Sequence, residues 1–187
     1  MAIAVIYGGT RKESNTEILA ENILQGITAE RVYLRNYHIH PIEDLRHAEG
    51  GFHPVNDDYD PIIDRIMPND ILLFVTPIYW YSMSGIMKNF IDRWSQTLRD
   101  ARYPGFKEAM KNKKAFVIAA GGDQPRLKGL PMIQQFQYIF DFIGISFEGY
   151  IIGNGNKPGD IHEDKEALFA AAELNKKLHL EAQPPSK

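Results

Sequence analysis

The chain has 187 residues, of which 44% are hydrophobic and 24% are charged, and its 21 basic and 24 acidic side chains give a formal net charge of -3. This composition is that of one ordinary globular domain, and it excludes collagen-like, low-complexity and disordered chains. The small negative charge argues against a nucleic-acid binder, and the absence of cysteine excludes disulfides, cysteine-bound iron–sulfur or zinc sites and a cysteine nucleophile.

The first half of the chain alternates predicted strands and helices. Ala2–Tyr7 is a continuous apolar run, which is typical of a strand buried on both faces, and a helical stripe of apolar residues over 19–27 follows it. Ala29–Leu34 alternates and suits a strand nearer the sheet edge, and Tyr59–Met67 predicts a short helix. The segment 36–58 is longer than most connections, which indicates either a functional loop or a mobile one.

The second half continues this alternation. Three more apolar runs predict strands, and three more helical stripes predict helices. The strands are Ile71–Val75, Ala115–Ala120 and Ile145–Ile152, the last interrupted by Glu148 and Gly149, and the helices cover 87–98, 130–143 and 168–178. Because strands that alternate with helices form parallel sheets through right-handed crossovers, we predict a three-layer α/β domain over residues 1–182. It has a five-stranded parallel sheet with helices on both faces, and residues 183–187 are expected to form a frayed tail.

Ligands of an open parallel sheet bind beyond the carboxyl ends of the strands, so the loops after the strands form the candidate site. The first loop, 8–16, has two glycines for a sharp turn, hydroxyl side chains, the cation Arg11, and Ser14 or Asn15 as a helix cap. Because N–H groups at a helix start bind anions, we interpret it as a monophosphate site; the simpler alternative is a capped helix after a turn. It lacks the glycine patterns of triphosphate and dinucleotide sites.

Three consecutive aromatic residues, Tyr79, Trp80 and Tyr81, follow the strand Ile71–Val75. They stand in a predicted connection beside Pro77, so they suit the wall of a flat, partly apolar ligand. The alternative is an aromatic cluster that covers the end of the sheet.

The strand Ala115–Ala120 ends in Gly121, Gly122 and Asp123, where two glycines allow a ring to approach the backbone closely. Alone this is a weak signal. A phosphate site, an aromatic wall and a glycine floor at one edge of one sheet together indicate flavin mononucleotide (FMN).

These loops resemble those of the flavodoxin-like flavoproteins, and more narrowly those of the NAD(P)H-dependent FMN reductase and quinone-reductase-like family. That family has a first loop close to G-S-x-R-x-x-[SG]-N-T and a third-strand loop close to P-[IV]-Y-[WFY]-x-x-[MV]-[SP]-[GA]. The chain matches the first with Gly9-Thr10-Arg11 and Ser14-Asn15-Thr16, and the second with residues 77–85. The resemblance covers nearly the whole domain and implies a flavodoxin-like fold, bound FMN and NAD(P)H as co-substrate.

The resemblance also implies three groups of cofactor-binding residues. The first loop would hold the phosphate, the third-strand loop would line the isoalloxazine ring, and the glycine loop would border its pyrimidine side. In that order the residues are Thr10, Arg11, Ser14, Asn15 and Thr16; Pro77, Ile78, Tyr79, Trp80, Tyr81, Ser82 and Met83; and Gly121, Gly122 and Asp123. Thr10 stands where the family more often has serine, and it keeps the hydroxyl.

Iron–sulfur flavoproteins are similar in pattern, but they carry a cysteine cluster shortly after the second strand, where this chain has 39–46 without cysteine. Four histidines remain nearby: His38, His40, His47 and His53. Their spacing matches no standard zinc pattern, so we predict solvated histidines and no metal. The segment 153–159 superficially resembles a dinucleotide loop, but we interpret it as a flexible connection without cofactor contact.

The chain is therefore expected to be an NAD(P)H-dependent FMN oxidoreductase. It would reduce quinones or similar acceptors, such as azo compounds, nitroaromatics or flavin, by ping-pong hydride transfer. No side chain is predicted to be a catalytic nucleophile or base, and N–H groups near Gly121 and Gly122 would stabilise charge on the ring. Two alternatives stay open: a flavodoxin-type electron carrier without nicotinamide turnover, and a regulatory module with an inaccessible flavin.

The remaining expectations concern partners and location. The resemblance implies a homodimer or homotetramer, with the aromatic residues 79–81 against the partner. Arg126 and Lys128 would favour NADPH over NADH, or simply belong to a solvated loop. Because the sequence shows no basic leader, no cleavage site and no apolar run of ~20 residues, a cytoplasmic protein without a membrane or nucleic-acid partner is expected.

Overall fold

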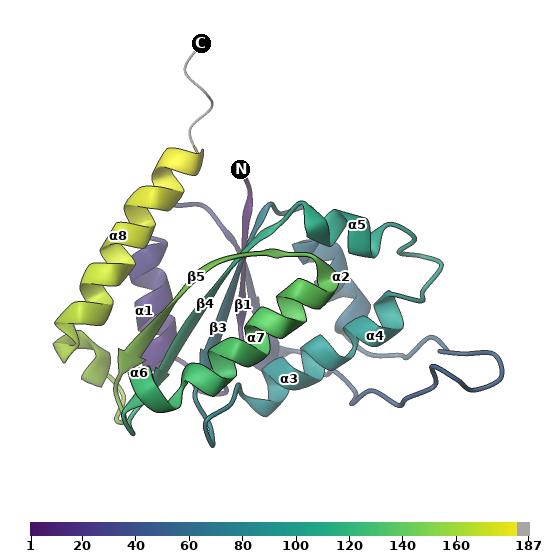
Figure 1. Ribbon diagram of the computed structural model, residues 1–187, viewed down its shortest axis with the longest axis horizontal. Helices are drawn as coiled ribbons and strands as arrows, with labels where there is room; N and C mark the ends of the chain where they lie inside the picture. Colours follow the sequence, from purple (N-terminus) through teal and green to yellow (C-terminus); the bar gives the residue numbers. More distant parts are fainter. Residues whose placement is uncertain (183–187) are drawn as a thin grey trace, which may run out of the picture.

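A computed structural model describes residues 1–182 (Figure 1). Its centre is a five-stranded sheet in the order β2-β1-β3-β4-β5, in which every neighbouring pair is parallel. This order is that of the flavodoxin-like fold, so the predicted fold class is confirmed. The expected tail, 183–187, lies outside the described residues. The strands are β1 (Ile3–Tyr7), β2 (Glu30–Tyr33), β3 (Ile71–Pro77), β4 (Lys114–Gly121) and β5 (Ser146–Asn154).

Helices cover both faces of the sheet (Figure 1). On one face lie α1 (Asn15–Ile23) and α8 (Lys165–Ala182), which pack against each other. The other face carries α2 (Tyr59–Ile66), α3 (Gly85–Asp92) and α7 (Leu130–Ile143). The shorter elements are α4 (Trp94–Thr97), α5 (Phe106–Lys111), α6 (Pro125–Lys128) and the 3-10 turns η1 (Leu34–Asn36) and η2 (Asp160–Glu163).

The central strands supply two separate cores, because successive side chains of a strand point to opposite faces. In β3, Leu72 and Phe74 pack with α2, α3 and α7, whereas Leu73 and Val75 pack with α1 and α8. This double burial explains the continuous apolar runs of the sequence. In residues 1–182, no helix has both the length and the apolarity that crossing a bilayer requires.

The helix predicted over 87–98 is two helices, which meet at Arg93. The Arg93 side chain is 2% exposed and forms an ion pair with Asp57 at 2.5 Å. It also donates hydrogen bonds to the carbonyl of His40 (3.1 Å) and the side chain of Gln96 (2.9 Å). The apolar stripe continues across this interruption, so its spacing could not reveal the break.

The last strand was expected to be buried on both faces, but β5 is an edge strand and its first five residues are half-buried or exposed. Its pairing with β4 shifts at Glu148: Ala115 faces Phe147, and Phe116 faces Gly149. Glu148 is thus the extra residue of a β-bulge. Glu148 and Gly149, which interrupt the apolar run in the sequence, therefore lie at this bulge.

The long segment that connects η1 to α2 is held against α3 and α4. Asn89 donates to the carbonyl of Ile39 (2.7 Å), and Gln96 donates to that of His53 (3.3 Å). Burial raises the pKa of Asp57, but the Arg93 guanidinium and backbone N–H donors outweigh it, so this pKa lies below its ordinary value. Within residues 1–182 no three histidine, aspartate or glutamate side chains form a group suited to a metal, and the absence of a metal stays a prediction.

Candidate functional site

The carboxyl ends of β1, β3 and β4 bring the three predicted loops to one edge of the sheet (Figure 1). Two adjoining pockets open there. The smaller, of about 180 Å³, lies at the start of α1 and is called the helix pocket; the larger, of about 320 Å³, lies beside the loop after β3 and is called the hairpin pocket. The two share a wall made of Ile78, Gly121, Gly122 and Asn156.

The helix pocket has the features of an anion site. Ser14 caps α1 by accepting a hydrogen bond from the N–H of Glu17 (3.3 Å), and its hydroxyl lies 3.0 Å from that of Thr16. In residues 1–182 the N–H groups of Asn15 and Thr16 find no acceptor, and the exposed guanidinium of Arg11 forms no ion pair. Helix N-termini with such N–H groups attract anions. All five residues predicted to hold the phosphate line this pocket: Thr10, Arg11, Ser14, Asn15 and Thr16.

The side chain of Asn15 is nevertheless engaged elsewhere. Its Nδ2 donates to the carbonyl of Lys157 (2.9 Å), and its Oδ1 accepts from the N–H groups of Gly159 (3.0 Å) and Ile161 (3.4 Å). The amide thus ties the connection between β5 and α8 to the start of α1. Of Asn15, the backbone N–H rather than the side chain is left to meet an anion.

The segment 153–159, which was interpreted as a flexible connection without cofactor contact, is tied to its surroundings by hydrogen bonds and reaches the helix pocket. Gly155 donates to the carbonyl of Gly121 (2.9 Å), and Asp160 accepts from the N–H groups of Asn156 (3.0 Å) and Lys157 (2.7 Å). These N–H groups hold the pKa of Asp160 below its ordinary value. Gly155 and Asn156 line the helix pocket. The position of this segment could have indicated its place, because it follows the carboxyl end of β5, where ligands of parallel sheets bind.

The connection from β3 to α3 begins with a tight hairpin. Tyr79 and Ser82 pair through two backbone hydrogen bonds, of 2.9 and 3.0 Å, and Trp80 and Tyr81 form the turn with φ angles of 49° and 64°. A left-handed conformation costs a non-glycine residue about 1–2 kcal/mol, and such strain is concentrated at ligand sites. The side chain of Trp80 is 93% exposed.

The hairpin divides its residues between the pockets and the core. Trp80 and Tyr81 line the hairpin pocket, Pro77 and Tyr79 line the helix pocket, and Ile78 lines both. Ser82 and Met83, which were predicted to line the ring, line neither. Because the two-residue turn sends the chain back toward the core, Met83 is 4% exposed there, and the Ser82 hydroxyl donates to Gln135 of α7 (3.2 Å).

Two buried hydrogen bonds of Ser84, which the sequence did not predict, connect the loop after β1 to the loop after β3. The hydroxyl of Ser84 donates to the carbonyl of Gly8 (2.6 Å), and its N–H donates to the hydroxyl of Thr76 (3.0 Å). A Cβ atom at Gly8 would lie 2.9 Å from that of Met87, so only glycine fits there. Ser84 is 1% exposed and Thr76 is fully buried, so water does not compete for these hydrogen bonds.

The loop after β4 closes the site. A Cβ atom at Gly122 would lie 2.7 Å from the Cβ of Asn156, which explains this glycine. Asp123 accepts hydrogen bonds from Lys128 (2.8 Å) and from the Tyr81 hydroxyl (2.9 Å), and these two donors lower its pKa. A polar bridge therefore joins the hairpin to α6 at the hairpin pocket.

The two cations expected near the site have different places. Lys128 lines the hairpin pocket and is paired with Asp123. Arg126 lines neither of the two pockets and pairs with Asp164 at 2.6 Å. Only Lys128 is therefore placed to meet a ligand in the hairpin pocket.

The donor set and shape of the two pockets suit a ligand with an anion at one end and a planar ring at the other. The helix pocket offers N–H groups, hydroxyls and a cation, whereas the hairpin pocket has aromatic and glycine walls. At the shared wall, Gly121 and Gly122 let the side chains of Ile78 and Asn156 pack directly on the backbone between the two pockets. FMN has this construction.

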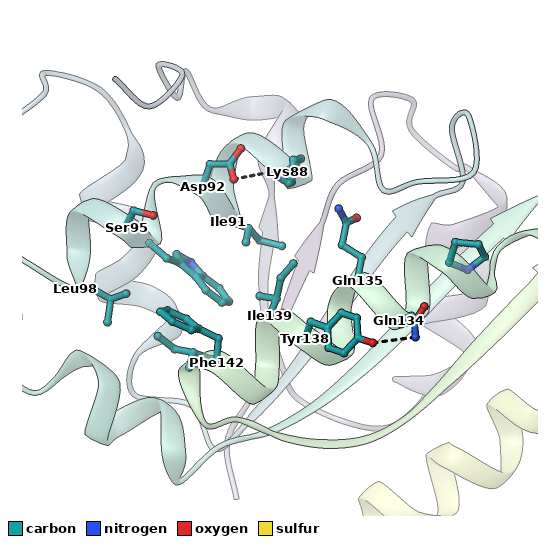
Figure 2. A pocket seen from close by; sticks show the side chains of 13 residues that line it. Lys88, Ile91, Asp92, Ser95, Leu98, Gln134, Gln135, Tyr138, Ile139 and Phe142 are labelled. Carbon is teal, nitrogen blue, oxygen red and sulfur yellow. Dashed lines mark hydrogen bonds and ion pairs between the residues drawn. The ribbon is translucent and has the colours of Figure 1, made fainter. Parts of the chain in front are cut away.

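A separate hollow lies between α3, α4 and α7 (Figure 2). This groove, of about 550 Å³, shares no lining residue with the two pockets. Its walls are mainly apolar, and its polar interactions include the Lys88–Asp92 ion pair (2.6 Å) and the Gln134–Tyr138 hydrogen bond (3.1 Å). It has no anion site among its lining residues comparable to the helix pocket.

Comparisons with known proteins agree with this geometry. The family model described as NADPH-dependent FMN reductase matches residues 1–142. A Bacillus subtilis protein named NAD(P)H-dependent FMN-containing oxidoreductase YwqN is 62% identical over 177 residues, which is 95% of this chain and 98% of that protein. Iron-sulfur flavoprotein MJ1083 of Methanocaldococcus jannaschii is 27% identical, over 95% of each chain. The solved structure of the Trp repressor binding protein from Bacillus subtilis has a TM-score of 0.78 and 53% identity, and covers 92% of this chain and 96% of that one.

Proposed function

The chain belongs to the NADPH-dependent FMN reductase family, and from this premise we propose how its residues serve that chemistry. The prediction of an NAD(P)H-dependent oxidoreductase with FMN as cofactor is confirmed by the family match and the 62% identical relative. The positions of cofactor and substrates on this chain, its acceptor and its assembly are the subject of the proposal.

We propose that the helix pocket holds the phosphate of FMN and the hairpin pocket holds its ring. The N–H groups of Asn15 and Thr16, the hydroxyls of Thr10 and Ser14, and Arg11 would bind the phosphate. Trp80, Tyr81, Gly122 and Asp123 would contact the ring, with Ile78 between the two ends. The observation that carries this proposal is the shared wall, which makes two differently built pockets into one elongated site.

Bound FMN supplies hydride transfer between the nicotinamide and the acceptor. The chain orients the ring through the hairpin and the glycine loop, and N–H groups at 121–123 would stabilise negative charge at the ring edge. The hairpin pocket opens to solvent beside the exposed Trp80, so donor and acceptor would use the same opening in turn. Ping-pong kinetics are then expected.

The proposed acceptors are quinones or similarly flat compounds, including azo compounds, nitroaromatics and flavins, because aromatic walls favour planar rings. The test is steady-state NADPH oxidation with menadione as acceptor, with and without FMN. FMN-dependent turnover with parallel double-reciprocal plots is expected. Bound FMN without nicotinamide turnover would support an electron carrier instead, and an FMN that cannot be reduced would support a regulatory module.

We also propose that the chain forms a homodimer or homotetramer in the cytoplasm. Tyr138 and Phe142 of α7 are 64% and 68% exposed beside the apolar groove, where Figure 2 shows both side chains. A surface that has both a groove and projecting aromatic side chains can pair with a copy of itself about a two-fold axis. The exposed aromatic residues 79–81 offer a second apolar surface near the opening of the site.

A further inference from the structure

The helix pocket and the hairpin pocket meet at a wall with one polar side chain. Of the four residues that line both, Ile78, Gly121 and Gly122 offer a ligand only apolar atoms and backbone, whereas Asn156 offers a carboxamide. In residues 1–182 this amide has no hydrogen-bond partner, although the N–H of the same residue is bound by Asp160 at 3.0 Å. The backbone of Asn156 is thus held in place, and its exposed side chain is open at its polar end.

The surrounding contacts hold the backbone of Asn156 beside the end of β4. The N–H of Gly155 donates a hydrogen bond to the carbonyl of Gly121, and the Asp160 carboxylate accepts hydrogen bonds from the N–H groups of Asn156 and Lys157. A Cβ atom at Gly122 would lie 2.7 Å from the Cβ and 3.1 Å from the Oδ1 of Asn156, so the side chain packs directly on the glycine loop. Its position is therefore set by the end of β4, and it lies between the two pockets.

We propose that Asn156 binds the hydroxyl-bearing ribityl chain that joins the phosphate of FMN to its ring. This inference rests on the proposed placement of FMN in the two pockets. A polyol chain that crosses the shared wall needs donors and acceptors, and a carboxamide offers both. Asn156 is then a specificity-determining residue that distinguishes a polyol linker from an apolar one.

The test measures dissociation constants by quenching of flavin fluorescence for two ligands. One is FMN, and the other is an analogue in which an unsubstituted pentyl chain joins the same ring to the same phosphate. Because a neutral hydrogen bond adds a modest amount to affinity, Asn156→Ala is expected to weaken FMN binding about three- to tenfold and to leave analogue binding unchanged. Unchanged analogue binding also shows that the variant is folded.

Asn154→Ala is the matched control, because Asn154 is an exposed asparagine at the end of β5, two residues before Asn156, and it lines neither pocket. It should bind both ligands as the wild type does. Equal weakening of both ligands by Asn156→Ala, or no weakening of FMN binding, would overturn the inference. Failure of the wild type itself to bind FMN would instead refute the placement of the cofactor, so the two failures are distinguishable.

Discussion

Among single residues, Arg11 is predicted to contribute most clearly to binding the phosphate of FMN in the helix pocket. Its guanidinium is exposed at the helix pocket and forms no ion pair within residues 1–182, so Arg11→Ala removes a cation without exposing a buried partner. A charged hydrogen bond contributes about 1.5–3 kcal/mol, so the dissociation constant of FMN is expected to rise about tenfold to a hundredfold. Riboflavin, which lacks the phosphate, should be little affected.

The measurement is a fluorescence titration with both flavins. Lys12→Ala is the control, because Lys12 is the adjacent exposed cation but does not line the helix pocket. If Arg11→Ala bound FMN as tightly as the wild type, Arg11 would have no part in holding the phosphate.

At the residue scale, the sequence predicted which residue types surround the site better than it predicted where their side chains point. Two glycines and a capped helix in loop 8–16 carry local signals, and the pocket they predict is present. The direction of the Asn15 amide depends on backbone atoms of Lys157 and Gly159, more than 140 positions later. Met83 lies in the core because of a two-residue turn whose strained aromatic residues have no usual turn signature.

At the scale of elements, Asn15 joins the start of α1 to the connection between β5 and α8. Asn15→Ala removes three hydrogen bonds to that connection. Because it leaves partly buried backbone groups without a partner, it is expected to lower the free energy of unfolding by about 1–3 kcal/mol. FMN binding should weaken as well, since Gly155 and Asn156 lose their support.

Hydrogen exchange measures this effect locally. Amides of residues 155–161 should exchange faster in Asn15→Ala, whereas Asn22→Ala, an exposed change on the same helix, should leave them as in the wild type. Unaltered protection of 155–161 in Asn15→Ala would show that other contacts hold the connection.

The junction of α3 and α4 depends on a buried ion pair. The side chains of Arg93 and Asp57 are 2% and 0% exposed. Removing one member of such a pair leaves an uncompensated buried charge, so Asp57→Ala is expected to lower the free energy of unfolding by about 3–5 kcal/mol. Urea denaturation measures this, with Asp44→Ala, which breaks an exposed pair with Arg46, as a control of small effect.

The same pair predicts how stability depends on pH. Because the pKa of Asp57 is lowered on folding, its contribution is fully present above the unfolded pKa, near the ordinary value of 3.8, and is lost as the pH falls through the lower folded value. Urea denaturation of the wild type at successively lower pH should show the stability falling as the pH drops below the ordinary value of 3.8. Asp57→Asn should flatten that part of the profile; an unchanged slope would assign the acid sensitivity to other carboxyls.

The order and type of the main elements were predictable, because buried parallel strands and amphipathic helices have different apolar patterns. The break between α3 and α4 and the exposure of β5 were not predicted, because they depend on contacts between residues distant in the sequence. The inward position of Arg93 requires Asp57, and the exposure of β5 follows from its place at the edge of the sheet. Neither can be read from the local pattern.

At the scale of the whole molecule, the sheet order explains why one edge carries the site. The loops after β1 and β3 are neighbours because these strands pair, and β4 adds the third loop on the far side of β3. The sequence predicted this edge through the general rule for parallel sheets. It did not predict the groove, because α3, α4 and α7 become neighbours only in the folded chain.

Self-association is tested on α7. Phe142→Glu places a charge on the exposed side chain beside the groove and is expected to give monomers in light scattering after gel filtration, where the wild type gives dimers or tetramers. Phe169→Glu is the matched control, since Phe169 is 69% exposed on α8, on the opposite face. A monomeric wild type, or an assembly that persists in Phe142→Glu, would contradict the proposed surface.

The placement of FMN is tested most directly by a crystal structure of the protein grown with the cofactor. We expect phosphate density at the N–H groups of Asn15 and Thr16, ring density between the hairpin and the loop 121–123, and the connecting chain beside Asn156. Density for FMN in the groove of α7, or a ring bound away from the hairpin, would contradict it.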